Sequence, residues 1–210
     1  MNETQVKEFF SRLEKENPNP KCELNYKNPY TLMVAIILSA QSTDKGVNKA
    51  TPNLFKVADS AEKMVALGEE ELKEYIKTIG LYNNKAKNII LMSKQLLEEF
   101  DGELPRERAK LETLAGVGRK SANVFLNVIY DEPYIAVDTH VFRVSNRTGM
   151  AIGKTPLEIE EGLEKVVPEC YKNRAGHWLV LLGRYTCTAK KPLCSDCKVK
   201  DLCGFKDKNS

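Results

Sequence analysis

The stretch "LETLAGVGRKSANVFL", residues 111–126, places two glycines around a single valine, then a lysine and an amphipathic run. Leu111 and Leu114 precede the glycines, and Phe125 follows them at helical spacing. Glycine allows backbone conformations that a side chain would obstruct. The pattern predicts two helices joined by a tight hairpin, with these apolar side chains packed between them and Ala122 letting the two backbones approach.

This hairpin predicts an anion site. The backbone amides of Gly116, Val117 and Gly118 converge with those of the following helix start, and such nests bind anions. Arg119 adds a positive charge beside them. A plain glycine turn between packed helices is the alternative, but the complete helix–hairpin–helix pattern favours a phosphate of a nucleic-acid backbone.

Lys120 lies in the first turn of the second predicted helix. The partial positive charge of a helix N-terminus disfavours an ammonium group, and partial burial would act in the same direction. Both effects favour the neutral amine, which is the nucleophilic form. A lysine that only grips a phosphate is the alternative, and this chemistry leaves it open.

Asp138 stands where an apolar segment ends and the helical pattern "THVFRVSNR" begins. Aspartate is a favoured N-cap, which is one role for this residue. The other role is a carboxylate that orients or deprotonates Lys120, if the two helices face each other across a cleft. An N-capping carboxylate is ionised, so Asp138 can fill both roles.

Helical patterns recur along the chain and strand patterns are nearly absent. In "KNPYTLMVAIILSAQ", Asn28 is the predicted N-cap and Pro29 the first helical residue. That helix is apolar on all sides, which is typical of a central, buried helix. "TPLE" at 155–158 predicts a capping box, and "DEP" at 131–133 is a candidate domain boundary. We therefore predict an all-α fold of about ten short helices.

Composition indicates an ordinary globular protein: 210 residues, 42% of them hydrophobic and 29% charged. The N-terminal residues show no secretory signal, and the longest apolar run, 32–38, is too short to span a bilayer. We expect a cytoplasmic protein without a membrane partner. Residues 172–206 hold eight Lys or Arg against two Asp or Glu. Taken alone, this basic segment is most simply a solvated, charged surface. In combination with the hairpin it favours a polyanionic partner.

Four cysteines crowd into 17 residues with the spacing C-x6-C-x2-C-x5-C: Cys187, Cys194, Cys197 and Cys203. Four thiolates in one short segment can close around a metal centre. Disulfides are disfavoured in a chain without a secretion signal. Structural zinc sites usually contain two close cysteine pairs, and only one such pair is present here. An iron–sulfur cluster fits the spacing best, with zinc as the rival.

Together, several segments resemble the endonuclease III family, bifunctional DNA glycosylases of the helix–hairpin–helix superfamily. They are "ILSAQSTD", "IKTIGLYNNKAKNI", "LAGVGRKSA", "VDTHVFRVSNR" and the cysteine segment. Each motif alone is moderately specific, whereas the combination is very specific. The resemblance extends over essentially the whole chain.

The resemblance implies two helical domains that flank a DNA-binding cleft. A six-helix barrel with the helix–hairpin–helix would occupy residues 22–132, and residues 1–21 and 133–210 would form a discontinuous domain with a 4Fe–4S cluster. Lys120 matches the family's Schiff-base lysine and Asp138 its catalytic aspartate. Gln41 matches the residue that fills the gap left by a flipped nucleotide, and Leu81 the side chain that wedges the opposite strand.

The function implied by the resemblance is base-excision repair. The family removes oxidised or ring-saturated pyrimidines from double-stranded DNA, then cleaves the strand at the abasic site by β-elimination. We expect a monomer at the prokaryotic nucleoid, with Lys190, Lys191 and Lys198 near the DNA phosphates. An adenine-specific mismatch glycosylase is one alternative, disfavoured by Lys120 and by a chain that ends soon after Cys203. A non-catalytic helix–hairpin–helix DNA-binding protein is another.

Overall fold

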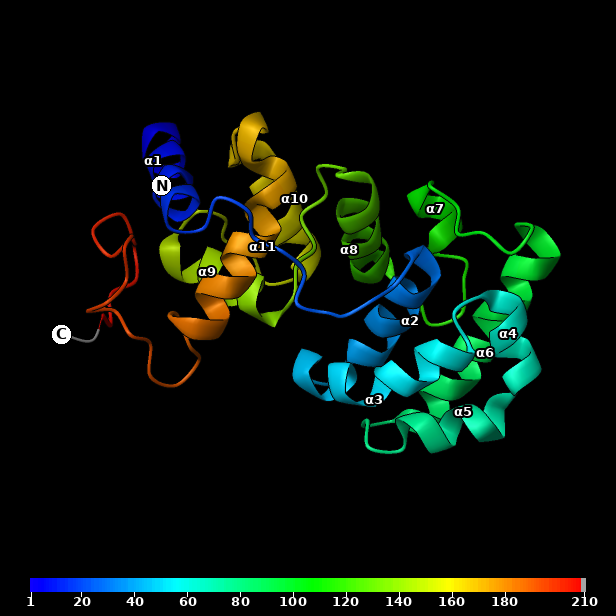
Figure 1. The fold of residues 1–210 in the computed structure, drawn as a ribbon. Helices are drawn as coiled ribbons and strands as arrows, with labels where there is room; N and C mark the ends of the chain where they lie inside the picture. The colour runs from blue at the N-terminus through cyan, green and yellow to red at the C-terminus, as the bar shows by residue number, and fades with distance from the viewer. Residues whose placement is uncertain (209–210) are drawn as a thin grey trace. The chain divides into compact units, whose positions relative to one another are not determined.

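The computed structural model describes residues 1–208, and within them it contains eleven α-helices and no β-strand. The chain divides into two compact units (Figure 1). Unit 1 consists of residues 1–22 and 131–210, and unit 2 of residues 23–130. The all-α fold expected from the sequence is confirmed. Within residues 1–208, every helix is too short or too polar to traverse a bilayer.

Unit 2 is built around one helix that is buried on all sides. It contains α2 (Pro29–Ser39), α3 (Asp44–Val57), α4 (Ala61–Leu67), α5 (Glu69–Ile76), α6 (Tyr82–Glu99), α7 (Arg108–Leu111) and α8 (Arg119–Tyr130). Every residue of α2 from Tyr30 to Leu38 is buried. This helix packs against α3, α6 and α8. The central helix predicted from its uniform apolarity is therefore present, with Asn28 as N-cap and Pro29 in the first turn.

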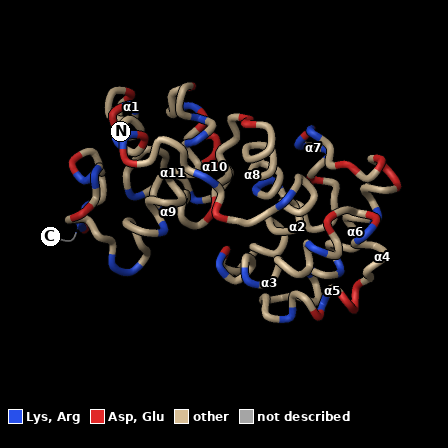
Figure 2. The backbone as a smooth tube through the Cα atoms, in the orientation of Figure 1, with Lys and Arg blue, Asp and Glu red and all other residues tan. Residues whose placement is uncertain are grey.

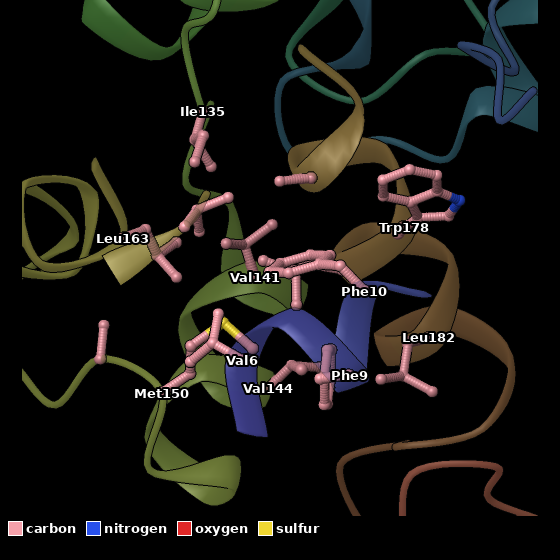
Figure 3. Close-up of a cluster of buried hydrophobic side chains, with 14 of the residues drawn as sticks. Val6, Phe9, Phe10, Ile135, Val141, Val144, Met150, Leu163, Trp178 and Leu182 are labelled. Carbon is pink, nitrogen blue, oxygen red and sulfur yellow. The ribbon is translucent and has the colours of Figure 1, made fainter. Parts of the chain in front are cut away.

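Unit 1 has a separate hydrophobic core formed by α1 (Glu3–Glu16), α9 (Thr139–Thr148), α10 (Pro156–Val166) and α11 (Glu169–Tyr185). Figure 3 shows Phe9 and Phe10 of α1 among side chains of α9 and α11. The Phe10 ring centroid lies 5.7 Å from that of Tyr171 and 6.0 Å from that of Trp178. The first helix therefore folds with the last three, across more than 100 residues of sequence.

Polar contacts also fasten α1 to the C-terminal part of unit 1. The Trp178 indole donates a hydrogen bond of 2.8 Å to the carbonyl of Asn17. The Arg12 guanidinium contacts Asp201 at 2.7 Å and donates to the carbonyl of Lys198 at 3.1 Å. Arg12 holds the pKa of the Asp201 carboxyl below its usual range. The apolar periodicity of α1 cannot show which helices it packs against, because these partners are remote in sequence.

One predicted cap differs from its expected form. Thr155 caps α10 as predicted, since its hydroxyl accepts from the backbone N–H of Glu158. The Glu158 carboxylate, however, accepts from the N–H of Lys154 at 2.8 Å, one residue before the N-cap. The carboxylate therefore closes the preceding turn, rather than the reciprocal capping box that "TPLE" predicts.

Candidate functional site

The glycine hairpin, residues 112–118, joins α7 to α8 as a tight turn. The N–H of Val117 donates to the carbonyl of Leu114 at 3.1 Å, and that of Ala122 donates to the carbonyl of Gly118 at 3.0 Å. Leu111, Leu114 and Phe125 are almost fully buried, and α7 packs against α8. The predicted helix–hairpin–helix is present, although its first helix is a single turn of four residues.

The two glycines of the hairpin have different structural roles. Gly116 has a φ of +77°, and an added Cβ would lie 3.0 Å from the Cβ of Asn88 on α6. At Gly118 an added Cβ would meet nothing within 4 Å. Gly116 is therefore required by the turn and by its contact with α6. Gly118 faces open space, beside the first-turn N–H groups of α8, which have no acceptor within that helix.

Gln95 of α6 holds the hairpin in place. Its side-chain oxygen accepts from the N–H of Ala115 at 2.8 Å, and its amide nitrogen donates to the carbonyl of Thr113 at 3.2 Å. Both bonds satisfy backbone groups of an irregular turn. Gln95 was not among the residues predicted for the site, and its polar position on an amphipathic helix gives no signal of this contact.

Lys120 and Asp138 lie in different units, each in the first turn or cap of a helix. Lys120 is the second residue of α8 and is exposed, so the partial burial that would favour its neutral form is not provided by the chain itself. Asp138 caps α9, and its Oδ1 accepts from the N–H groups of His140 and Val141, each at 2.8 Å. The N-cap role of Asp138 is confirmed, and the cap uses only one carboxylate oxygen.

Gln41 and Leu81 both occupy turns in which the backbone is left-handed. Their φ angles are +54° and +60°, and both side chains are exposed. Among residues 1–208 the other non-glycine residues with positive φ are Asp101 and Asp131, a residue type that tolerates this region. For Leu81 the conformation costs on the order of 1–2 kcal/mol. Residues held in such sparsely populated backbone conformations cluster at functional sites.

The four clustered cysteines line one pocket in the segment that follows α11. Cys187, Cys194, Cys197 and Cys203 share this pocket with Val199 and Phe205, among others. All four are partly buried and none forms a disulfide. Burial raises the pKa of the Cys197 thiol, and the other three cysteines raise it further. Among the described residues, 1–208, no three His, Cys, Asp or Glu side chains are placed to hold a single metal ion. The four cysteines instead surround a shared pocket, which suits a larger group with four thiolate ligands.

Two arginines of α9 fix the chain around this pocket. Arg147 donates to the carbonyls of Thr188 and Ala189 at 2.7 and 2.8 Å, and to the sulfur of Cys187 at 3.5 Å. Arg143 donates to the carbonyl of Cys187 at 3.0 Å. Their positions in "VFRVSNR", four residues apart on one helix face, are the signal that could have identified them.

The basic residues predicted near DNA lie on the same segment. Lys190 and Lys191 are exposed, in a turn closed by the Thr188 hydroxyl, which donates to the carbonyl of Lys191 at 2.6 Å. Figure 2 shows positively charged stretches along the chain between α11 and the C-terminus. Lys198 is also exposed, and its ammonium lies 3.9 Å from a carboxylate oxygen of Glu16.

Comparison with known proteins gives concordant results. Residues 34–169 match the model of the HhH-GPD superfamily of base excision DNA repair proteins, and residues 187–203 match the iron–sulfur binding domain of endonuclease III. Endonuclease III of Haemophilus influenzae is 54% identical over 208 residues, 99% of each chain. Endonuclease III of Escherichia coli K12 is 53% identical with the same coverage. This chain belongs to the endonuclease III family.

A solved structure of a trapped endonuclease III–DNA covalent intermediate also superimposes on this chain. Its TM-score is 0.91 at 41% identity, covering 97% of this chain and 96% of that one. Membership of the endonuclease III family makes the chain a DNA-binding, bifunctional DNA glycosylase and abasic-site lyase of base-excision repair. The match to the iron–sulfur domain identifies its cofactor as a 4Fe–4S cluster. The iron–sulfur cluster that the cysteine spacing favoured is therefore confirmed, and the rival prediction of a structural zinc ion is wrong.

The contrast between the two hairpin glycines predicts different effects on stability. Gly116→Ala should lower the thermal unfolding midpoint, because the new Cβ meets Asn88 and the φ is left-handed. Gly118→Ala should leave the midpoint close to that of the wild type. Thermal denaturation followed by circular dichroism measures both. Equal midpoints for the two variants would contradict the assignment of Gly116 to the turn and Gly118 to open space.

Proposed function

We propose that the substrates of this enzyme are oxidised or ring-saturated pyrimidines in double-stranded DNA, together with abasic sites. The observation that carries the proposal is Lys120, exposed at the start of α8 directly after the glycine hairpin. A hairpin that binds the DNA backbone would bring an amine at this position to the sugar of a neighbouring nucleotide. The endonuclease III family as a whole supports the same substrate class.

In this proposal Lys120 is the nucleophile. Its neutral amine attacks C1′ of the damaged nucleotide, the C1′–N glycosidic bond breaks, and the base departs with the bonding electrons. The attacking nitrogen then loses one proton, and the C1′–O4′ bond breaks as O4′ takes up a proton, which opens the sugar ring and leaves an iminium that keeps one N–H. Loss of a C2′ proton then expels the 3′ phosphate, and water releases Lys120. The similar structure of a trapped endonuclease III–DNA covalent intermediate supports a covalent route.

Because Lys120 is exposed in the chain alone, the neutral amine requires a further contribution. The flipped nucleotide would exclude water from the amine when it binds, and loss of water disfavours a charged group. We propose that Asp138 accepts the proton from Lys120 and stabilises the positive charge that builds on the sugar. The carboxylate oxygen not used by the α9 cap is suited to this role.

The remaining predicted residues would bind and distort the duplex. The amides of Gly116, Val117 and Gly118, with Arg119 and Lys191, would contact phosphates. The damaged nucleotide must leave the base stack to react, since C1′ is inaccessible within the duplex. Gln41 would fill the vacated space and Leu81 would wedge the opposite strand. Exposed side chains on fixed turns suit this role, and apolar wedges kink DNA.

We also propose that Cys187, Cys194, Cys197 and Cys203 are the ligands of the cluster. When bound, its irons would tie four points of the cysteine segment together and hold the basic turn at Lys190 and Lys191.

The enzyme would act as a monomer at the nucleoid, where its DNA substrate is found. Units 1 and 2 would be the cluster domain and the helix–hairpin–helix domain.

Gly118→Ala tests the phosphate site without disturbing the turn. The added methyl group would occupy the space in which a phosphate approaches the amides, so affinity for duplex DNA should fall by about tenfold for every sequence alike. Fluorescence anisotropy with damaged and undamaged duplexes measures this. Unchanged affinity in a normally folded Gly118→Ala would place the phosphate elsewhere.

Borohydride trapping tests Lys120 as the nucleophile. Wild type mixed with a duplex containing thymine glycol and borohydride should give a covalent protein–DNA adduct, because reduction fixes the iminium. Lys120→Gln and Lys120→Arg should give none while still binding the duplex, since a guanidinium is not nucleophilic. Asp138→Asn should bind but turn over at least about tenfold more slowly, and Asn preserves the α9 cap. Efficient trapping by Lys120→Gln would assign the chemistry to another amine.

The same assay separates the alternatives. Cleavage of A·G mispairs in preference to thymine glycol would indicate an adenine-specific mismatch glycosylase. DNA binding without any base release would indicate a non-catalytic DNA-binding protein.

Iron analysis tests the cysteine ligands. Cys197→Ser should lose most of the bound iron and acid-labile sulfide, because a serine oxygen is a poorer ligand for the cluster than a thiolate. Cys170→Ser is the matched control, since Cys170 is exposed on α11 and is not part of the pocket. A full complement of iron in Cys197→Ser would exclude that residue as a ligand.

A further inference from the structure

A buried lysine joins the two turns that carry Gln41 and Leu81. Lys85 lies in the first turn of α6 and is only 5% exposed. Its ammonium nitrogen lies 2.9 Å from the carbonyl oxygen of Leu38 and 2.9 Å from the hydroxyl of Ser42. Its own backbone N–H donates to the carbonyl of Leu81 at 3.1 Å.

These three contacts connect both turns through one residue. Leu38 and Ser42 flank Gln41, so the Lys85 ammonium bridges the backbone on one side of the Gln41 turn and a side chain on the other. The backbone bond of Lys85 fixes the residue that carries the Leu81 side chain. Gly80, directly before Leu81, also approaches this point, since a Cβ there would lie 4.0 Å from the Ser42 hydroxyl.

Burying the Lys85 ammonium costs free energy of folding, because the charge is removed from water. Lysine is rarely buried without a charged partner, and here the hydrogen-bond acceptors are a carbonyl and a hydroxyl, both neutral. Desolvation accordingly lowers the pKa of Lys85. One compensation is that Leu38 lies in the last turn of α2, where the carbonyl end of a helix attracts a cation. A hydrophobic residue would fill the same volume without holding Ser42 or the Leu38 carbonyl.

We propose that Lys85 is a positioning residue that clamps the Gln41 turn to the Leu81 turn, so that the two side chains enter the duplex as a unit. The inference rests on the proposed roles of Gln41 and Leu81 in filling and wedging the duplex. Each turn has a left-handed, strained residue at its tip. Without the clamp, each could relax to a lower-energy backbone and the spacing between the two tips would be lost.

The experiment compares substrates that do and do not need a wedge. A single strand with an abasic site has no partner strand to separate, whereas thymine glycol in a duplex must be extruded from the stack. Lys85→Met, which keeps the length and removes the charge and hydrogen bonds, should lower kcat/KM on the duplex by about tenfold or more. Strand cleavage of the single-stranded abasic oligonucleotide should remain within about twofold of wild type.

Two further variants serve as references for the duplex and single-strand activities of Lys85→Met. Lys87→Met is the matched control, because Lys87 is exposed on the same helix, and both activities should stay at the wild-type level. Leu81→Ala should reproduce the selective duplex defect of Lys85→Met. The double variant should be little worse than either single one, since both changes disable the same wedge.

Each outcome has one interpretation. An equal loss on both substrates in Lys85→Met would overturn the clamp and assign Lys85 to general stability. Wild-type duplex activity in Leu81→Ala would instead overturn the wedge itself, and with it the proposed role of that residue. If Lys85→Met does not fold, Ser42→Ala decides: it removes one of the two ammonium contacts and should give a smaller defect, again restricted to the duplex. An unchanged ratio of the two activities in Ser42→Ala would refute the clamp.

Discussion

The nine consecutive buried residues of α2, Tyr30 to Leu38, oblige unit 2 to cover that helix on every side. Such a helix cannot lie at a surface, because its apolar area would remain in water. Helices α3, α6 and α8 supply the cover. Helix α6 begins directly after Leu81 and α8 begins beside Lys120, and α2 ends two residues before Gln41. All three residues are predicted site residues. Helix ends suit such positions, because the first N–H groups and the last C=O groups lack partners within the helix. The central helix therefore fixes where the ends of α2, α6 and α8 lie.

The sequence predicted features with a local cause. The Asn28 cap, the apolar α2 and the glycine hairpin each follow from neighbouring residues, and the structure contains all three. The opposite contributions of Gly116 and Gly118 could not be predicted, because they depend on where Asn88 lies in space. The resemblance to a family supplied Gln41 and Leu81. The structure added their left-handed backbones, which spacing alone does not reveal.

Lys85 shows why the remainder could not be predicted. In sequence it is one lysine in a helix that also carries Lys87 and Lys94, and a charged helix residue is ordinarily solvated. Its position four residues before Ile89, on the apolar stripe of α6, was the available signal. The apolar stripe indicates only that Lys85 faces inward, and it does not identify the groups that accept its hydrogen bonds. Its acceptors, Leu38 and Ser42, lie more than 40 residues earlier in the chain and are brought to it by the packing of α2 on α6.

The cysteine segment, residues 186–208, has too few buried hydrophobic side chains to fold by packing alone. Residues 186–208 contain no helix, and Val199 is their one fully buried hydrophobic side chain in the core of unit 1. The segment is held by hydrogen bonds from Arg143 and Arg147, and by an ion pair with Arg12 of α1. Surface ion pairs contribute little to stability. A cluster with the four proposed cysteine ligands would close the segment at four points and remove much of its conformational freedom. The basic turn at Lys190 and Lys191, which Arg147 and the Thr188 hydroxyl already hold by hydrogen bonds, would then be ordered further by metal coordination rather than by a hydrophobic core.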